Sequence, residues 1–165
     1  MSTTLVCPVP LEQQPVQEYQ ELKQSWFYGW ALVSGFKFLK PLIIVWGLSW
    51  LISAPIATAS FPMAKEPLHF GLSAGAGAFV IPMLLLVRLY FGWTYIRDRL
   101  MQDTIVYEES GWYDGQTWKK TEEVLQRDRL IASYDVMPML ARLRKAVGGL
   151  LGVVGAGALV WIVVG

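Results

Sequence analysis

Three long stretches of the chain are almost free of formal charge. Residues 41–64 contain no charged side chain, residues 67–87 contain only the ionisable His69, and residues 146–165 again contain none. A helix needs about 20 apolar residues to cross a bilayer core, so each stretch is long enough. The pattern predicts an all-α membrane protein with three transmembrane helices. The alternative is a set of buried helices in a soluble protein, but a chain this short rarely needs three such runs.

The polar positions between these stretches divide the chain into four segments. Residues 1–40 are expected to form a cytoplasmic tail that ends in an interfacial segment. Residues 41–101 are expected to form a two-helix membrane hairpin with a helical extension. Residues 102–137 then form a connector, and residues 138–165 form a third helix that enters and crosses the membrane. Because the first 25 residues are polar, we expect no signal peptide.

Basic residues are distributed unevenly around the predicted spans. Three lie in residues 1–40 and nine in residues 94–145, whereas the loop between the first two spans holds only Lys65. Arg88 lies near the end of span two and is expected to extend toward the headgroups. Lys and Arg accumulate on the cytoplasmic side of membrane proteins. We therefore expect the N-terminus and the connector to be cytoplasmic and the C-terminus to lie on the opposite side.

The connector carries the signals of a small β-hairpin. Residues 104–107 are β-branched and aromatic, and Asp114-Gly115 is a turn signal because glycine accepts the positive φ of a tight turn. The sequence therefore predicts a hairpin that carries Trp112 and Trp118.

A helix is expected to follow the hairpin. Thr121 is placed to cap it, and Glu122 and Glu123 suit the positive end of its dipole. Pro138 is expected to start a further helix that leads into span three. Within the spans, Pro55 and Pro82 predict kinks or local ends. The aromatic-rich residues 26–39 are expected to lie along the membrane surface.

Small residues recur at intervals of four in the predicted spans. Gly71 and Gly75 open span two, and Gly148, Gly152 and Ala156 follow one another down span three. Small residues at this interval let helix backbones approach closely in lipid. Small residues are also common in membrane helices generally, so the spacing alone does not establish that these helices are in contact.

The composition excludes several kinds of chemistry. The net charge of +1 gives no electrostatic footprint for nucleic acid. No Ser-His-Asp arrangement is expected around the single histidine, His69, and a single cysteine excludes a disulfide framework or a cysteine cluster for zinc. No small-molecule substrate is indicated, and the sequence predicts a protein that is not an enzyme. No cofactor is predicted.

Two residues remain as weak candidates for a cofactor or a metal. His69 lies at the outer start of span two, where an imidazole could ligate the metal of a pigment. Cys7 could bind a metal ion or respond to redox state through its thiol. An ordinary interfacial histidine and an inert thiol are the simpler interpretations. A pigment-binding or metal-binding membrane protein is therefore the alternative function.

Several runs of residues carry a resemblance to a known family. They are residues 7–15 (CPVPLEQQP), Glu18-Tyr19, residues 25–27 (SWF), residues 88–93 (RLYFGW), residues 107–116 (YEESGWYDGQ) and residues 127–131 (RDRLI). The chain resembles an uncharacterised cyanobacterial and plastid membrane family. That family includes proteins named for conservation in the green lineage and diatoms, and a reading frame retained in algal plastid genomes. Lys120-Thr121 stands where Lys-Pro is frequent in the family.

The resemblance implies a photosynthetic membrane, with thylakoid as the expected location and the connector facing the cytoplasm or stroma. It supplies no reaction. Together with the exposed aromatic residues, it favours a scaffold or assembly factor that contacts membrane lipid and a larger membrane protein complex. The expected partner-binding residues lie in the tail and the connector: Cys7, Pro8, Pro10, Gln13, Gln14, Tyr19, Trp112, Tyr113, Asp114, Gly115, Trp118, Arg127, Asp128 and Arg129.

Overall fold

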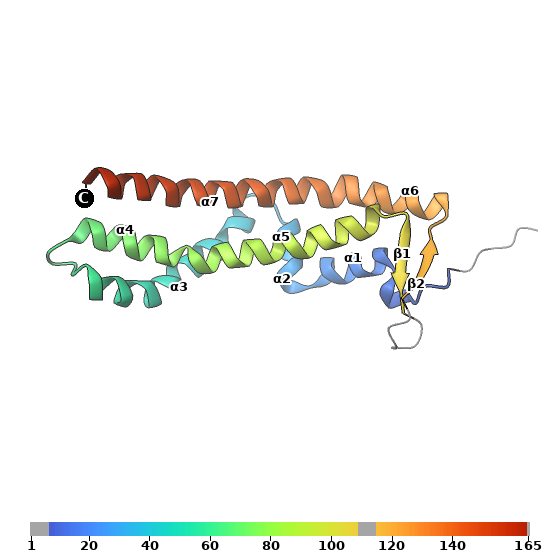
Figure 1. Cartoon of the computed structure of the whole chain (residues 1–165), viewed down its shortest axis with the longest axis horizontal. Helices are drawn as coiled ribbons and strands as arrows, with labels where there is room; N and C mark the ends of the chain where they lie inside the picture. The colour runs from blue at the N-terminus through green and yellow to red at the C-terminus, as the bar shows by residue number, and fades with distance from the viewer. Residues whose placement is uncertain (1–6, 109–114, 165) are drawn as a thin grey trace, which may run out of the picture. The chain divides into compact units, whose positions relative to one another are not determined.

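A computed structural model describes residues 7–108 and 115–164, and these residues are predominantly helical (Figure 1). The elements in chain order are η1 (Leu11–Gln13), α1 (Pro15–Gln24), α2 (Trp26–Gly29), η2 (Trp30–Leu32), α3 (Phe36–Ser60), α4 (Pro67–Ala78), α5 (Val80–Met101), β1 (Thr104–Tyr107), β2 (Gln116–Lys119), α6 (Glu122–Ile131), η3 (Ala132–Val136) and α7 (Met137–Val164). Three helical stretches are long and apolar enough to cross a membrane: Phe36–Ser60, Pro67–Met101 and Glu122–Val163. The prediction of three such helices is confirmed.

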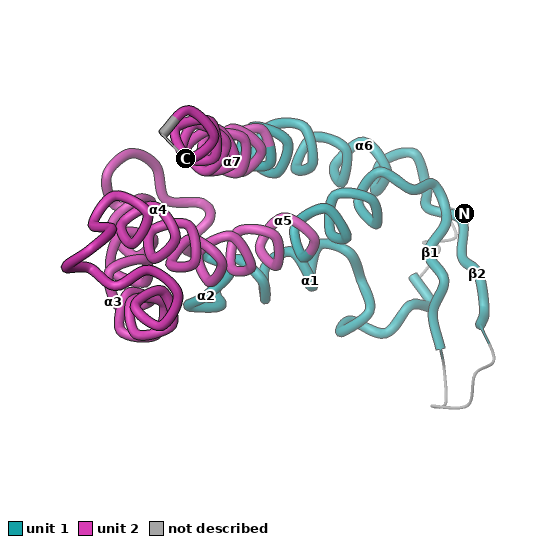
Figure 2. The backbone as a smooth tube through the Cα atoms, turned by 60° about the vertical axis from the view of Figure 1, so that its left-hand side comes forward, with its two compact units in different colours: residues 1–29, 92–140 teal, residues 30–91, 141–165 magenta. Residues whose placement is uncertain are grey.

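The chain folds into two compact units that interleave along the sequence (Figure 2). The polar unit comprises residues 1–29 and 92–140, and the span unit comprises residues 30–91 and 141–165. The polar unit holds seven Lys and Arg residues and twelve Asp and Glu residues, whereas the span unit holds seven basic residues and one acidic residue. The four consecutive segments expected from the sequence therefore combine into two units, each built from both halves of the chain.

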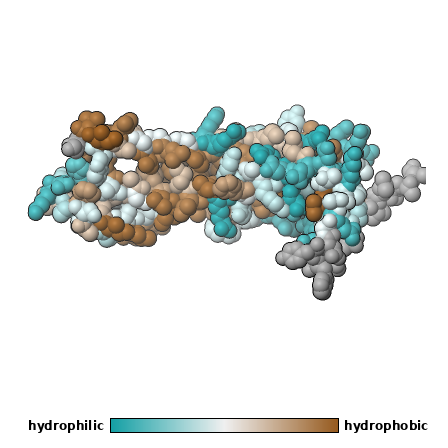
Figure 3. All heavy atoms as spheres, in the orientation of Figure 1, coloured by the Kyte–Doolittle hydropathy of each residue, from teal (hydrophilic) through white to brown (hydrophobic). Residues whose placement is uncertain are grey.

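The span unit is organised around the contact between α3 and α4. Leu42, Ser49, Ser53 and Ala57 are the buried residues of α3, and their spacing of seven, four and four places them on one helix face. Ala74 and Ala78 are the buried residues of α4. Brown, hydrophobic atoms gather over the helices of this unit in Figure 3. Most of this apolar surface is open, as expected for helices that face lipid.

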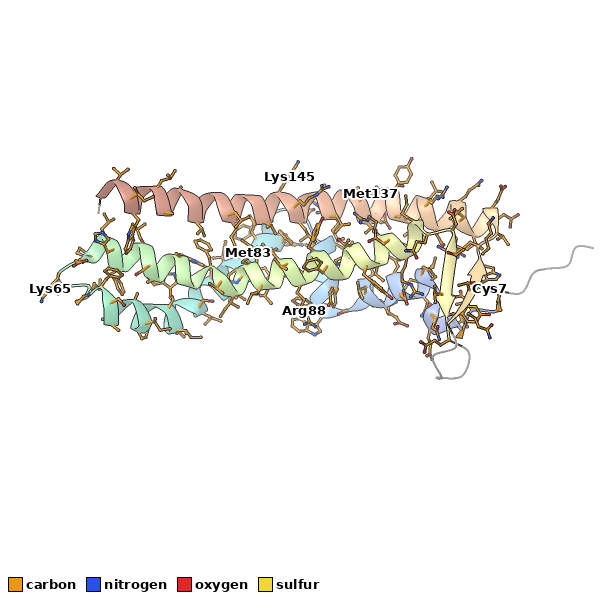
Figure 4. All side chains as sticks on the ribbon, viewed as in Figure 1. Cys7, Lys65, Met83, Arg88, Met137 and Lys145 are labelled. Carbon is orange, nitrogen blue, oxygen red and sulfur yellow. The ribbon has the colours of Figure 1, made fainter. Side chains whose placement is uncertain are left out.

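Charged residues mark the two ends of the span unit. Figure 4 places Lys65 at the connection between α3 and α4, and places Arg88 and Lys145 at the opposite end of the same unit. The helix α3 begins at Phe36, five residues before the charge-free stretch, so Lys37 and Lys40 are helical. Residues 26–32, expected to lie on the membrane surface, form the short helical turns α2 and η2.

Prolines act differently in the first two spans. Pro55 lies inside α3, which continues to Ser60. The second span is interrupted instead: α4 ends at Ala78 and α5 begins at Val80. Pro82 lacks the N–H that would bond to the carbonyl of Ala78, so the backbone is weakened at this point. The expected effect of proline is therefore confirmed as a local end in span two.

The α-helix α7 begins at Met137, beside Pro138, but it follows the preceding helical segment without a break. The chain is helical from Glu122 to Val164 because a π-helical segment, η3, joins α6 to α7. At its end the N–H of Met137 bonds to the carbonyl of Ala132, five residues earlier. This wider turn lets the helix pass the proline, which has no N–H to donate. Thr121 occupies the N-cap position of α6 as expected, but its side chain makes no capping hydrogen bond.

Candidate functional site in the polar unit

The hairpin of the polar unit pairs β1 with β2 in antiparallel register. Ile105 is opposite Trp118, and Tyr107 is opposite Gln116, whose side-chain oxygen lies 3.1 Å from the Tyr107 hydroxyl. Residues 108–115 separate the strands. Gly115 does not have the positive φ expected of it, since among the described residues only Gly35 has one. The two strands expected from the sequence are therefore confirmed, whereas Asp114, with which Gly115 was expected to form a tight turn, lies outside the described residues.

The N-terminal segment packs against this hairpin. Val9, Ile105 and Tyr107 form a buried cluster, with Cys7 and Trp118 packed at its edge. Figure 4 shows Cys7 beside the strands. Burial of these apolar groups contributes roughly 25 cal/mol for each Å² removed from water. The Cys7-Pro-Val-Pro run was expected to extend toward a partner, but its residues contribute to the fold of the polar unit itself.

Two neighbouring glutamines hold this segment in place. The side-chain amide of Gln13 donates to the carbonyl of Glu108 at 2.9 Å, and its oxygen accepts the N–H of Glu108 at 2.9 Å. This pair of bonds imitates the pairing of one more strand residue beyond β1. Gln14 donates to the carbonyl of Val9 at 3.1 Å and lies 3.8 Å from the Cys7 sulfur.

Arg99 connects α5 to the same N-terminal segment. Its Nε lies 3.0 Å from the Glu18 carboxylate, and its guanidinium donates to the carbonyl of Gln13 at 2.9 Å and to the Tyr95 hydroxyl at 3.0 Å. Burial raises the pKa of Glu18, while the charge of Arg99 opposes that shift and Glu21 adds to it. These hydrogen bonds of the Arg99 guanidinium are therefore all made to residues of the polar unit.

Lys120 and Asp128 form a buried ion pair. The ammonium lies 2.8 Å from the carboxylate, and the side chains are 0% and 1% exposed. The neighbouring arginines pair within the polar unit too: Arg127 lies 3.3 Å from Asp128, and Arg129 donates to Asp103 at 2.9 Å. The run Arg127-Asp128-Arg129 was expected to bind a partner. Its contacts instead fit internal salt bridges, and its binding to a partner stays a prediction.

Tyr19 fastens α1 to the π-helical segment. Its hydroxyl donates to the Asp135 carboxylate at 2.7 Å, and its ring meets the buried ring of Trp93 edge-on at 6.1 Å. Burial raises the pKa of Tyr19, and the hydrogen bond and charge of Asp135 raise it further. The expected partner-binding residue Tyr19 is thus buried inside the polar unit.

An exposed row of apolar side chains remains on the helix that contains η3. Leu130, Tyr134 and Met137 are 57%, 76% and 40% exposed, and they lie within eight residues of one continuous helical stretch. We call these three residues the apolar strip. These residues were not among the expected partner-binding residues, because the aromatic content of the connector favoured the tryptophans of the hairpin. Of those, Trp118 is half-buried and packs inward.

The other residues that were expected to bind a partner differ in how exposed they are. Trp112, Tyr113 and Asp114 lie outside the described residues. Pro8 and Gly115 are exposed, and Pro10 is half-buried before η1.

Five small residues of the spans were expected at helix contacts. Of these, only one lies close to a side chain of a neighbouring helix among the described residues. A Cβ on Gly75 would lie 3.7 Å from the Trp50 ring, whereas one on Gly71, Gly148 or Gly152 would meet nothing within 4 Å. Ala156 is exposed. The expected contact down span three is therefore not made within the described chain, because the side of α7 that bears these residues faces outward. Gly77, which packs on Ser53, was not expected.

His69 lies among aromatic rings in the span unit. Its ring stacks on Phe61 at 5.8 Å and meets Trp161 edge-on at 4.6 Å, while its Nδ1 lies 3.5 Å from Glu66. No three His, Cys, Asp or Glu side chains gather in a metal-binding group in the part of the chain that the structure describes. Neither His69, which has Glu66 beside it, nor Cys7 therefore belongs to a group of three such side chains in the described residues.

Comparison with known proteins identifies relatives that match most of the chain. Residues 7–149 match the family described as CGLD27-like, Conserved in the green lineage and diatoms 27. The uncharacterized protein ycf36 of Porphyra purpurea is 46% identical over 138 residues, 84% of each chain. The chloroplastic protein Conserved in the green lineage and diatoms 27 of Arabidopsis thaliana is 43% identical over 152 residues, which are 92% of this chain and 45% of the relative.

A more distant relative is the uncharacterized protein ycf36 of Cyanophora paradoxa, which is 38% identical over 149 residues, 90% of this chain and 94% of the relative. No solved structure matches the chain. The family match covers both the polar unit and most of the span unit, and it confirms the resemblance noted in the sequence. This chain belongs to the CGLD27-like family.

Proposed function

We propose that the protein is a non-enzymatic membrane scaffold that assists the assembly or maintenance of a photosynthetic membrane complex. Its three apolar helices hold it in the bilayer, and its polar unit contacts the partner complex from the cytoplasmic or stromal side. The chloroplastic name of the Arabidopsis relative supports a photosynthetic membrane, with thylakoid as the proposed location. The excess of basic residues in the span unit supports the proposed sidedness.

The apolar strip is the observation that carries this proposal. Within the polar unit, the charged side chains near the strip pair with one another, as in Arg129 with Asp103 and Lys120 with Asp128. Leu130, Tyr134 and Met137 instead present apolar surface to the outside. Large apolar and aromatic groups supply most of the binding energy in protein interfaces. Three basic residues, Arg142, Arg144 and Lys145, separate the strip from the charge-free part of α7.

The test is an affinity purification in mild detergent from the native photosynthetic membrane. The tagged protein is compared with the double variant Leu130→Gln/Tyr134→Ser and with Leu11→Gln, an equally exposed apolar position on η1 of the same unit. We expect subunits of one membrane complex to co-purify with the native protein and with Leu11→Gln, and to be lost with the double variant. Both variants should retain the helical circular dichroism of the native protein, because none of the replaced side chains is buried.

Two results would contradict the proposal. If the double variant retains the same partners as the native protein, the apolar strip is not the docking face. If the protein purifies alone from gently solubilised membranes, a scaffold role is wrong.

The alternative function, pigment or metal binding through His69 or Cys7, stays a prediction. An absorption spectrum and a metal analysis of the purified protein test it. A Soret-like band that disappears in His69→Ala would favour the alternative over the scaffold.

A further inference from the structure

The strand β1 pairs with β2 along one of its edges only. The N–H of Lys120 bonds to the carbonyl of Asp103 at 2.8 Å, and the register places these two residues directly opposite each other. In an antiparallel pair, residues that bond to the partner strand alternate with residues whose N–H and C=O point away from it. Ile105 therefore bonds to β2, whereas Thr104 and Val106 direct their backbone groups to the outer edge.

The backbone of Glu108 points to the same outer edge. It lies two residues after Val106, and both its N–H and its carbonyl bond to the side chain of Gln13. The corresponding groups of Thr104 and Val106 make no hydrogen bond at this edge within residues 7–108 and 115–164, and both residues are exposed. Within the described chain, the outer edge of β1 therefore carries backbone donors and acceptors that can receive a further strand.

A hollow of about 350 Å³ lies along this open edge. Three consecutive residues of β1 border it, Thr104, Ile105 and Val106, and its opposite wall includes Pro15 of α1 and Tyr95 of α5. Successive side chains of a strand point to opposite faces, so a hollow that touches three residues in a row lies along the edge. The hollow gives a further strand room to place a side chain beside α5.

The outer edge of β2 is less suited to a further strand. The same alternation places Thr117 and Lys119 at that edge. Lysine is a residue with which proteins block strand edges against pairing. Residues 104–107 of β1 carry no charge. The edge of the hairpin that is open to pairing is therefore the outer edge of β1.

The charges around β1 favour one kind of partner. Acidic residues flank the strand: Asp103, which also pairs with Arg129, precedes it, and Glu108 follows it. The polar unit as a whole holds twelve acidic and seven basic residues, an excess of five negative charges. Opposite charges across neighbouring strands stabilise the pair, whereas like charges destabilise it. A basic segment therefore suits this edge better than a second copy of the same acidic unit.

We propose that β1 binds an extended, basic segment of a partner protein as a third strand of the hairpin. The backbone of that segment bonds to Thr104 and Val106, and its basic side chains face Asp103 and Glu108. Main-chain bonds supply the affinity in this mode of recognition, and pockets for alternate side chains supply the specificity. The proposal goes beyond the scaffold function, because it concerns a surface formed by β1 and α5 rather than the apolar strip.

The test is a titration of the purified full-length protein, in a nonionic detergent, with a fluorescent peptide of alternating lysine and valine. A version that is N-methylated at alternate residues keeps the charge but cannot pair with a strand edge. A version with glutamate in place of lysine reverses the charge.

Two protein variants locate the binding edge. Val106→Pro removes one outward N–H, a change that strands tolerate where the N–H faces outward at an edge. Thr117→Pro makes the same change at the outer edge of β2 and is the matched control, because Thr117 lies opposite Val106 in the hairpin.

We expect the lysine peptide to bind saturably, the N-methylated peptide to bind at least about tenfold more weakly, and the glutamate peptide not to bind. Val106→Pro should weaken the affinity about five- to tenfold, the effect of one lost hydrogen bond, and Thr117→Pro should change it less than about twofold. The bound peptide should slow the hydrogen exchange of the Thr104 and Val106 amides, followed by NMR. It should leave the Ile105 amide unchanged, because that amide is already bonded to β2.

Equal affinities for the lysine peptide and its N-methylated version would overturn the proposal, because charge alone would then explain the binding. This comparison does not require Val106→Pro to fold. Equal losses in Val106→Pro and Thr117→Pro would also overturn it, and so would a dimer of the native protein that dissociates in Val106→Pro. The double variant Leu130→Gln/Tyr134→Ser should bind the peptide like the native protein, so failure of the scaffold function and failure of this proposal are distinguishable.

Discussion

The ammonium group of Lys120 lies 2.8 Å from the carboxylate of Asp128, and both groups are shielded from water. The same ammonium donates to the carbonyls of Arg99 and Leu100 at 3.0 and 3.1 Å. These carbonyls belong to the last turn of α5, where a helix has no internal donors left. Lys120 therefore connects three elements: the C-terminal end of α5, the strand β2, which ends just before Lys120, and the helix α6.

Lys120→Met is expected to destabilise the polar unit by about 3–5 kcal/mol, because it leaves the charge of Asp128 buried without a partner. The loss is measured as a lower midpoint of thermal unfolding by circular dichroism in detergent. The double variant Lys120→Met/Asp128→Leu should recover part of the loss, since no buried charge remains. A double variant that is as unstable as the sum of both single variants would show that the ion pair is not the cause.

Tyr19→Phe is expected to remove a hydrogen bond to the Asp135 carboxylate and to cost about 1 kcal/mol, since Asp135 is itself exposed. The raised pKa of Tyr19 also predicts a dependence on pH. The folded state favours the neutral phenol, so its contribution is complete below the ordinary pKa of tyrosine and is lost as the pH rises through the higher folded value. Unfolding midpoints between pH 8 and 12 should fall less steeply for Tyr19→Phe than for the native protein. Equal slopes would contradict the assignment.

Gln13→Met keeps the length of the side chain but removes both bonds to the backbone of Glu108. We expect the N-terminal segment to separate from the hairpin more often, at a cost of about 1–2 kcal/mol for two partly exposed bonds. Hydrogen exchange of the Glu108 amide, followed by mass spectrometry, should become faster by about five- to thirtyfold. Gln17→Met, a change on α1 away from these bonds, serves as the control and should leave that amide unchanged.

Gly35→Ala is expected to destabilise the start of α3 by about 1–3 kcal/mol, because Gly35 has φ of 70° and ψ of −146°, a conformation that is nearly restricted to glycine. Gly47→Ala is the matched change inside the same helix, where an added Cβ meets nothing within 4 Å. It should be neutral or stabilising, because alanine is the better helix former. Thermal unfolding of the two variants provides the comparison, and equal midpoints would contradict the role given to Gly35.

The spans were predictable because each depends on a local property. A bilayer requires about 20 apolar residues in a row, and the chain shows this directly in residues 41–64, 67–87 and 146–165. The strands of the hairpin were predictable for the same reason, since β-branched and aromatic residues mark Thr104–Tyr107. The effect of Pro138 was not predictable from the sequence. Its missing N–H can be accommodated either by the start of a new helix or by a π turn. The hydrogen bond between Tyr19 and Asp135 accompanies the π turn.

The role of individual side chains in the candidate site was harder to predict. Tyr19 and Trp118 were expected to face a partner, because aromatic residues are frequent in interfaces. Their burial depends on residues far away in the chain, namely Trp93 and Asp135 for Tyr19 and Val9 for Trp118. The apolar strip is the reverse case, in which side chains remain exposed because no segment among residues 7–108 and 115–164 covers them.

The sequence alone determined that this protein has three helices able to cross a membrane, a polar connector with a hairpin, and membership of one family. These properties follow from composition, local pattern and similarity along the chain. Only the tertiary structure decided that Lys120 and Asp128 neutralise each other, that Gln13 holds the hairpin, and that Tyr19 is bonded to Asp135. A polar residue is the same in the sequence whether its side chain has a hydrogen-bond or ionic partner in the fold or has none. Which of the two it is depends on atoms that the fold brings to within about 3 Å of it.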